Sequence, residues 1–559
     1  MTIHRISIVL TFVVIFTTFL RLLPAEAAPE FTDKQAATIG AYMDDLVGEG
    51  EPGYAVGIVI DGDIVFSDYA GLALIDTPTP INEETRFNIA SVAKQFTALM
   101  VLDLARGGQI DLSADFRTYL PGAMPSVEAE ITVAHLITHT SGIRDVYDLF
   151  FLTNGTWYES DFTNGTALDL LEQQRALNFD PGTSHRYSNS NYILLAELIA
   201  GVTGEPFPAY AKAFFEARGM EATSARRRQG AIIPNLARAY GNYGSGWIEN
   251  PDIANTYGDG FMYATLSDLL TWETQVWGHG ATLDPDLIRE SQAPLNGSAH
   301  SSYGYGLEFG FYRGLPITYH EGATGSYNTY VLRFPEQKVS IVTTGNTNQV
   351  NAVALARVIA NFLLKDAFKN GEGYPSGPPS LSPFSGGEAQ LGLYAFEDNS
   401  LITLTRKDGD LYREMEWADP VRLIQKDANL FHHETDASLK MALSRDADGR
   451  SQIALYSPDQ VPKFAVHIPA VPEGKPYRQS LEGTFYNRET DTEIILEHTE
   501  NDTFTMIKNK RPRTLTLMGR DYLVWNAYRI RVLRDDTGRA NGLSVDRNRI
   551  RNVMFIRTD

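Results

Sequence analysis

The sequence contains no cysteine among its 559 residues, and this absence excludes several kinds of chemistry at once. Disulfide bonds, thiolate zinc sites and a cysteine nucleophile are all ruled out, as is a lipid anchor on an N-terminal cysteine. Positive charge is also scarce, because 48 Lys and Arg face 69 Asp and Glu, a formal net charge of −21. Nucleic acids and anionic membrane surfaces are bound mainly through excess cations, so we expect neither as a partner.

Two familiar hydrolase motifs are missing as well. No His-Glu-x-x-His zinc motif is present, and the eleven histidines are scattered, so we expect no metal ion and no cofactor. No Gly-x-Ser-x-Gly occurs either, which argues against the nucleophile turn of α/β-hydrolases. What the chain does have is 43% hydrophobic residues, enough to bury large cores.

The first residues have the pattern of a signal peptide. Arg5 precedes an apolar run from Ile6 to Leu20, and Ala25-Glu-Ala27 matches a signal-peptidase site. A membrane anchor is the alternative, but the run is short for spanning a bilayer. We expect residues 1–27 to be removed and the protein to be exported, periplasmic or secreted, without stable membrane insertion.

Composition divides the remaining chain into three parts. A Pro/Gly/Ser-rich stretch over 369–387 predicts a linker, and a shorter break over 469–476 separates two further pieces. We therefore expect a first domain over 28–368 and two smaller domains over 388–470 and 471–559.

The first domain mixes helical and strand patterns, whereas the later pieces contain strands. Helical spacing over 32–47 and 89–105, with a hairpin turn at Asp61-Gly62, indicates an α+β fold with one antiparallel sheet flanked by helices. The later pieces show short alternating strands joined by turn residues, which is typical of small β-barrels or sandwiches. Their similar openings, Gly392-Leu-Tyr and Gly483-Thr-Phe, indicate a weak internal repeat. The alternative is that any two all-β modules resemble each other to this extent.

The first candidate for chemistry is Ser91-Val-Ala-Lys94. Three residues apart on a helix, the two side chains share a face, so the amine can reach the hydroxyl. A serine needs a neighbouring base to become a nucleophile, and a desolvated lysine can serve. The motif is common by chance, but a lysine at the start of an apolar helix is rare unless it is paired.

Two further sequence elements could form one site together with Ser91 and Lys94. In Tyr187-Ser-Asn189, a phenol whose pKa is lowered by a cation such as Lys94 can relay protons, and Asn189 can bind a substrate amide. In His320-Glu-Gly322, the glycine would let a ligand approach a backbone N–H that stabilises an oxyanion. His320 could donate to a substrate carbonyl or carboxylate. Turn chemistry explains either element equally well when it stands alone.

In this order and spacing, the three elements resemble the penicillin-recognising serine hydrolases, and most closely their class C β-lactamase-related branch. The segment ITVAHLITHTSGI at 131–143 and the segments 258–265 and 303–306 also fit that branch. The resemblance covers about residues 30–365 and implies a β-lactamase/transpeptidase-like fold. It places two histidines of the first segment in the scaffold, His135 and His139.

The resemblance also implies roles for the candidate residues. Ser91 would be the acylated nucleophile, with Lys94 and Tyr187 as the acid–base pair, and either of these could take the first proton. The backbone N–H groups of Ser91 and Ala323 would form the oxyanion hole. The residues that would bind substrate are Asn189, His320, Gly322 and Ala323.

One departure from true β-lactamases bears on the substrate. They carry lysine where this chain has His320, and histidine is neutral or only partly charged near pH 7, so it binds a carboxylate less well. Histidine there is typical of the D-aminopeptidases and several esterases of the branch, and the D-aminopeptidase also has two barrel-like domains. This favours a peptidase or amidase on small or unusual peptides, D-amino-acid peptides included. The alternatives are a carboxylesterase, a DD-peptidase or β-lactamase, and an acylating binding protein.

The excess of carboxylates favours a substrate with a free amine. A loop of the second barrel could reach the cleft and bind that amine, with Asp491, Glu493 and the Asn501-Asp502 turn as candidates. Besides a small peptide or ester substrate, the partner that we consider is a second copy of the chain, in a homodimer.

Overall fold

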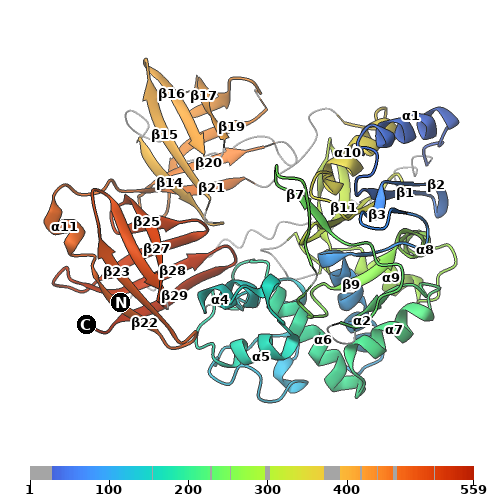
Figure 1. Ribbon diagram of the computed structural model, residues 1–559, viewed down its shortest axis with the longest axis horizontal. Coiled ribbons are helices and arrows are strands. Elements are labelled where there is room, and N and C mark those ends of the chain that lie inside the picture. The colour runs from blue at the N-terminus through green and yellow to red at the C-terminus, as the bar shows by residue number, and fades with distance from the viewer. Residues whose placement is uncertain are drawn as a thin grey trace, which may run out of the picture.

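The computed structural model describes residues 28–559 apart from 154, 227–229, 252, 296–301, 370–390, 399, 416–417, 428, 437, 458–461 and 509. The predicted signal peptide and nearly all of the predicted linker lie outside the described residues, so export stays a prediction. Figure 1 shows a domain of helices and sheet on the right and two barrels on the left, the first in orange and the second in red.

A six-stranded antiparallel sheet forms the centre of the first domain, as expected. The predicted hairpin turn at Asp61-Gly62 joins two of its strands, and both residues have positive φ, 50° and 90°, as a type I′ turn requires. In sheet order the strands are β10 (Glu308–Tyr312), β11 (Leu315–Thr324), β12 (Tyr327–Phe334), β13 (Val339–Gly345), β1 (Tyr54–Ile60) and β2 (Asp63–Ala70).

Both faces of the sheet are covered. Successive side chains of β1 point to opposite sides, so this strand contributes to a core on each face. Val56 and Ile58 enter a core with α1 (Asp33–Asp44) and α10 (Ala352–Leu363). Val59 enters the main core on the other face, where α8 (Leu266–Val276) lies so close that a side chain at position 57 would collide with Leu270. The expected α+β architecture is confirmed.

A helical half adjoins this second face. Its helices are α2 (Lys94–Arg106), α3 (Val133–Ile137), α4 (Val146–Leu152), α5 (Asn164–Glu172), α6 (Asn189–Thr203), α7 (Phe207–Glu216) and α9 (Pro285–Ser291), with 3-10 turns η1 (Ala90–Ala93), η2 (Phe116–Thr118) and η3 (Trp157–Glu159). Small sheets border it: β5 (Arg86–Asn88) with β9 (Met262–Thr265) and β6 (Ser224–Ala225), β3 (Leu72–Leu74) with β4 (Thr79–Pro80), and β7 (Tyr240–Asn242) with β8 (Trp247–Glu249).

Each later piece is a closed barrel of eight consecutive antiparallel strands, so the barrel prediction is confirmed. The first barrel comprises β14 (Gly392–Phe396), β15 (Leu401–Lys407), β16 (Asp410–Met415), β17 (Ala418–Asp427), β18 (Leu430–His433), β19 (Lys440–Arg445), β20 (Ser451–Tyr456) and β21 (Lys463–Ile468). After α11 (Lys475–Gln479), the second comprises β22 (Gly483–Asn487), β23 (Thr492–His498), β24 (Thr503–Lys508), β25 (Arg511–Gly519), β26 (Tyr522–Trp525), β27 (Tyr528–Arg534), β28 (Ala540–Arg547) and β29 (Ile550–Arg557).

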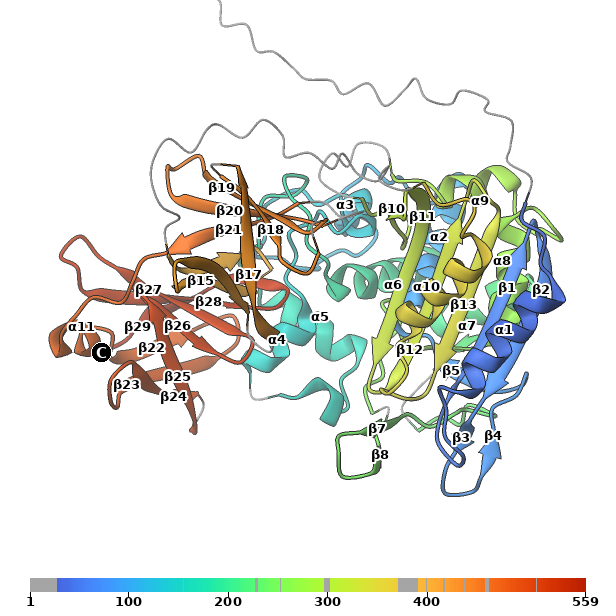
Figure 2. The same cartoon turned by 90° about the horizontal axis from the view of Figure 1, so that it is seen from above.

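The second barrel is docked on the helical half through α4, as Figure 2 also shows. Leu149 and Leu152 of this helix are fully buried in one core with the interior of the barrel. The hydroxyl of Thr492 in β23 donates to the carbonyl oxygen of Leu152 at 2.9 Å. Within the described part of the chain, no helix has the length and apolarity needed to cross a membrane.

Candidate active site

Ser91 lies in the 3-10 turn that leads from β5 into α2. In a 3-10 turn, side chains three residues apart eclipse one another, so Ser91 and Lys94 stand directly above each other. The residue before the serine, Ala90, has a φ of 45°, an uncommon value for a residue with a side chain. The side-chain oxygen of Asn88 accepts from the Ala90 N–H at 2.9 Å and holds this strained turn.

Lys94 is completely buried, and its amine contacts three oxygen atoms. It is 3.0 Å from Ser91 Oγ and 2.9 Å from Asn189 Oδ1, and it also contacts the carbonyl oxygen of Asp259. Burial lowers the pKa of Lys94 to about 7. A neutral amine has two N–H donors and one lone pair: the amide and carbonyl oxygens can take the two donors, which leaves the lone pair for the Ser91 hydroxyl.

Tyr187 and Asn189 stand at the start of α6, on the other side of the serine. The Lys94 amine lies 4.9 Å from the centre of the Tyr187 ring, and the Ser91 side chain is close enough to the phenol to affect its pKa. Sequence reasoning expected a lowered phenol pKa, and this is wrong in sign: burial raises the pKa of Tyr187, and the opposing effects of Arg549 and Ser91 are smaller. The phenol therefore keeps its proton at neutral pH.

The side chain of Asn189 is held in place by a buried carboxylate. Asp145 Oδ2 accepts from both the backbone N–H of Asn189, at 2.8 Å, and its side-chain amide, at 2.9 Å. Because the amide nitrogen is used in this way, the amide oxygen points to Lys94. Asp145 thus orients the residue that in turn positions the lysine.

The C-terminal end of β11 forms the wall of the site opposite α6. Strand β10 pairs with β11 only as far as Tyr319, so the edge from 320 to 324 is free to lie against η1. A Cβ at Gly322 would come within 2.3 Å of the Ile89 carbonyl oxygen and 3.0 Å of the Ser91 nitrogen. The glycine therefore admits the backbone beside Ser91, rather than a ligand, and leaves the neighbouring Ala323 lining the cavity.

His320 is buried on this strand with both ring nitrogens engaged. Nε2 is 2.8 Å from the Tyr303 hydroxyl, and Nδ1 is 2.6 Å from the carbonyl oxygen of Glu321. Burial is the main cause that lowers its pKa to about 3, so the ring is neutral at physiological pH. In this arrangement no ring nitrogen remains for the substrate contact that was predicted.

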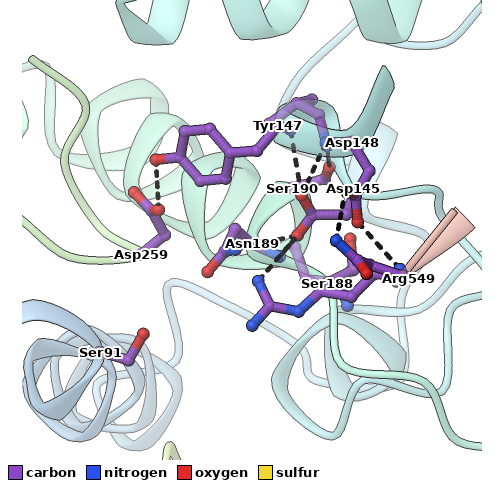
Figure 3. A network of polar contacts seen from close by, with 12 residues as sticks. Ser91, Asp145, Tyr147, Asp148, Ser188, Asn189, Ser190, Asp259 and Arg549 are labelled. Atoms are coloured by element: carbon purple, nitrogen blue, oxygen red, sulfur yellow. Dashed lines mark hydrogen bonds and ion pairs between the residues drawn. The ribbon is translucent and has the colours of Figure 1, made fainter. Parts of the chain in front are cut away.

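A cavity of about 280 Å³ opens beside Ser91, and the second barrel supplies part of its wall. The barrel contribution comes from the β28–β29 turn, and Figure 3 shows Arg549 reaching from it toward Asp145 and Asn189. The carboxylates that were expected to bind a substrate amine do not line the cavity. Asp491 accepts a hydrogen bond from Tyr486, and Asp502 pairs with Arg478. The barrel does reach the site, but the segment differs from the one expected and its charge is opposite. The full lining is Ala90, Ser91, Asp145, Tyr147, Asp148, Phe151, Trp157, Asn189, Asp259, Gly260, Phe261, Ala323, Thr324, Arg547, Asn548 and Arg549.

Comparison with known proteins identifies the family of the chain. The model of the β-lactamase family matches residues 36–364, more than half of the chain. The chain belongs to the β-lactamase family. D-aminopeptidases of Gluconobacter oxydans and Cereibacter sphaeroides are 29% and 28% identical to it, over 55% and 57% of this chain and 58% and 61% of theirs. The match thus spans about three fifths of the length of these curated relatives.

The solved structure of an octameric penicillin-binding protein homologue from Pyrococcus abyssi shares the fold. It is 19% identical, with a TM-score of 0.53, and the alignment covers 78% of this chain and all of that one. The β-lactamase-family domain therefore brings Ser91, Lys94, Tyr187 and Asn189 together, while the roles of these residues remain predictions.

Among the site residues that the sequence analysis missed, three left a trace in the sequence. Asp145 follows the family-like segment 131–143 by two positions, and Asp259 lies inside another such segment. Arg549 belongs to a turn with three arginines in five residues, a conspicuous cluster in a chain of net charge −21. Among the described residues, no group of three or more His, Asp and Glu side chains could hold a metal ion.

Proposed function

We propose that this member of the β-lactamase family is a serine peptidase or amidase that acts on D-amino-acid substrates. The observation that carries the proposal is the contact of the buried Lys94 amine, whose pKa burial lowers to about 7, with the hydroxyl of Ser91. The D-aminopeptidase names of the relatives support the substrate class.

The geometry favours Lys94 as the first base and Tyr187 as the acid. Lys94 takes the proton of Ser91 Oγ as the oxygen attacks the substrate carbonyl, and the oxyanion develops next to the N–H groups of Ser91 and Ala323. Tyr187, which stays protonated, donates to the leaving nitrogen and is reprotonated from Lys94. Water then cleaves the acyl-enzyme with the same pair in reverse.

An unpaired carboxylate oxygen supports a substrate with a free amine. Asp259 is 3% exposed and lines the cavity; its Oδ2 accepts from the Tyr147 hydroxyl at 2.7 Å, but none of the described residues hydrogen-bonds its Oδ1. Buried polar atoms are nearly always paired, so an ammonium group of the substrate is a fitting partner. Asp259→Asn should raise KM for D-amino-acid amides more than for acyl substrates without an amine.

The test of the reaction is a panel of D- and L-amino-acid amides, short peptides, p-nitrophenyl esters and a chromogenic cephalosporin. We expect turnover of D-amides and loss of all turnover in Ser91→Ala, with mass spectrometry locating a fluorophosphonate label on Ser91. Ser438→Ala, an exposed serine of the first barrel, is the matched control. Turnover of esters without D-amides, or full activity of Ser91→Ala, would contradict the proposal.

We also propose that the protein works outside the cytoplasm, because residues 1–27 carry the signal-peptide pattern. Sequencing the N-terminus of protein from cell fractions should give Ala28 in the exported fraction. An intact N-terminus in the cytoplasmic fraction alone would contradict export.

A further inference from the structure

The β28–β29 turn presents three arginines, and two of them are used to hold the turn in place. Arg547 contacts the carboxylate of Asp148 and packs 3.8 Å from the centre of the Phe151 ring. Arg551 is 7% exposed and donates to the backbone oxygens of Asn548 at 2.6 Å and of Ile550 at 2.8 Å. Arg547 also lines the cavity, but its charge is paired with the carboxylate of Asp148.

The guanidinium of the third arginine lies 4.8 Å from the centre of the Tyr187 ring, and the backbone of this residue, Arg549, is fixed. Its N–H donates to Asp148 Oδ2 at 2.9 Å, and its carbonyl oxygen accepts from Asn178 at 3.1 Å. The side chain is 46% exposed, and its nearest carboxylate oxygen, on Asp145, is 3.7 Å away, beyond hydrogen-bond distance. Among the described residues, none accepts a hydrogen bond from this guanidinium.

Asp145 forms an ion pair with Arg549 at 3.7 Å but accepts no hydrogen bond from its guanidinium. Its two oxygens already accept the backbone N–H groups of Tyr147 and Asn189 and the side-chain amide of Asn189. The guanidinium therefore keeps a free edge of parallel N–H donors toward the cavity, the geometry that pairs with a carboxylate through two hydrogen bonds.

The two other residues that could attract an anion near Ser91 are occupied. His320 is neutral with both nitrogens engaged, and the Lys94 amine is held by three oxygens. The positive charge that faces the cavity comes from the second barrel instead.

We propose that Arg549 binds a carboxylate of the substrate, so that the enzyme prefers D-amino-acid substrates bearing a carboxylate over matched neutral ones. The inference rests on the proposed function and narrows it. The carboxylate can be the C-terminus of the released residue or an acidic side chain of the D-residue, and both present the same two oxygens to the guanidinium.

Two matched substrate pairs distinguish these sources. D-alanyl-D-alanine and its C-terminal amide differ in the terminal carboxylate, whereas the p-nitroanilides of D-glutamate and D-glutamine differ in the side chain. For each pair the readout is the ratio of kcat/KM for the acid to that for the neutral partner. An effect of position 549 on Lys94 or Tyr187 acts on both partners and cancels in this ratio.

In wild type we expect a ratio of about 10–100 in the pair whose carboxylate reaches Arg549, the usual range for a charged hydrogen-bonded pair. Arg549→Met should bring the ratio close to one, mainly through KM. Arg549→Lys should retain part of the preference for the acid, because the positive charge stays but the paired N–H donors of the guanidinium are lost. Arg539→Met, an exposed arginine of the same barrel, should leave the ratio unchanged. A wild-type ratio near one in both pairs, or a ratio that Arg549→Met does not lower, overturns the inference.

A fluorophosphonate probe separates this failure from failure of the proposed function. If Ser91 is labelled and D-amides are hydrolysed but the ratios do not respond to position 549, only the carboxylate subsite is wrong. Protection of Ser91 from the probe by each compound gives the same acid-to-neutral comparison without turnover. An unlabelled Ser91 with no hydrolysis of D-substrates overturns the function and the subsite together.

Discussion

The two barrels share one strand order but relate to the first domain in different ways. The second barrel shares a core with α4. It also contacts the first domain through the ion pair of Arg144 and Glu489, whose side chains are 1% and 11% exposed. The first barrel touches the same region through Glu397, whose side chain is 75% exposed and pairs with Arg186. Its backbone oxygen also accepts from Arg551 of the second barrel.

The comparison teaches that the barrel fold alone decides little about function. What differs is the chemistry of one turn and the surface on which the barrel docks. The second barrel completes the cavity beside Ser91, whereas none of the described residues of the first barrel lines it. The barrels should therefore respond differently to equivalent substitutions.

The largest effect is expected from removing the charge of Glu489. Glu489→Gln leaves Arg144 buried without its counter-ion, which should lower the free energy of unfolding by about 3–5 kcal/mol. Urea denaturation followed by tryptophan fluorescence measures the loss. A change below about 1 kcal/mol would show that the neutral acceptors around Arg144, such as Asn552 O at 2.9 Å, suffice without the ion pair.

A cavity at the shared core should cost slightly less. Leu152→Ala removes a fully buried side chain between α4 and the second barrel, a change that usually costs about 2–5 kcal/mol. Hydrogen exchange should then accelerate in both α4 and the second barrel. Leu404→Ala, an equally buried leucine of the first barrel, is the control and should accelerate exchange in its own barrel alone. Equal responses would mean that both barrels are coupled to the first domain.

The pH profile links the second barrel to the chemistry. Because the reaction needs neutral Lys94, with a pKa of about 7, kcat/KM should fall about tenfold per pH unit below pH 7 and level off above it. The positive charge of Arg549 is one cause of that lowered pKa, so Arg549→Met should raise it and move the acidic limb to higher pH. Rates with a neutral p-nitrophenyl ester give the profile, and Arg539→Met should leave it in place. If the acidic limb of Arg549→Met stays at the wild-type pH, the second barrel does not influence the pKa of Lys94.

The smallest effect belongs to the first barrel. Glu397→Gln removes the exposed partner of Arg186, whose own side chain is 11% exposed, and should change stability by about 1 kcal/mol, because solvent screens the charge of Glu397. The same urea measurement as for Glu489→Gln gives a matched comparison. A loss of about 3 kcal/mol would abolish the distinction between the barrels.

The sequence was informative wherever local patterns decide the outcome. The type I′ turn at Asp61-Gly62 and the strand alternation of both barrels follow from spacing and turn chemistry. The pairing of Ser91 with Lys94 follows as well, since three residues bring them onto one face.

Features that depend on docking and burial could not be predicted in this way. The sign of the Tyr187 pKa shift is set by its surroundings, which no pattern around position 187 contains. Arg549 meets Asp145 only because the second barrel closes and packs on α4, so composition suggested carboxylates where the cavity has arginine. Position in space, rather than residue type, decided these cases.

The turn that carries Arg549 also affects how the molecule is made. Asp148 and its partner Arg547 are separated by 399 positions, so at about 5–20 residues per second a ribosome needs about 20–80 s to go from one to the other. During that interval the emerging chain already contains its nucleophile but not the last wall of its cavity. Closure of β29 onto β22 finishes the barrel, so specificity should be acquired later than the folded first domain.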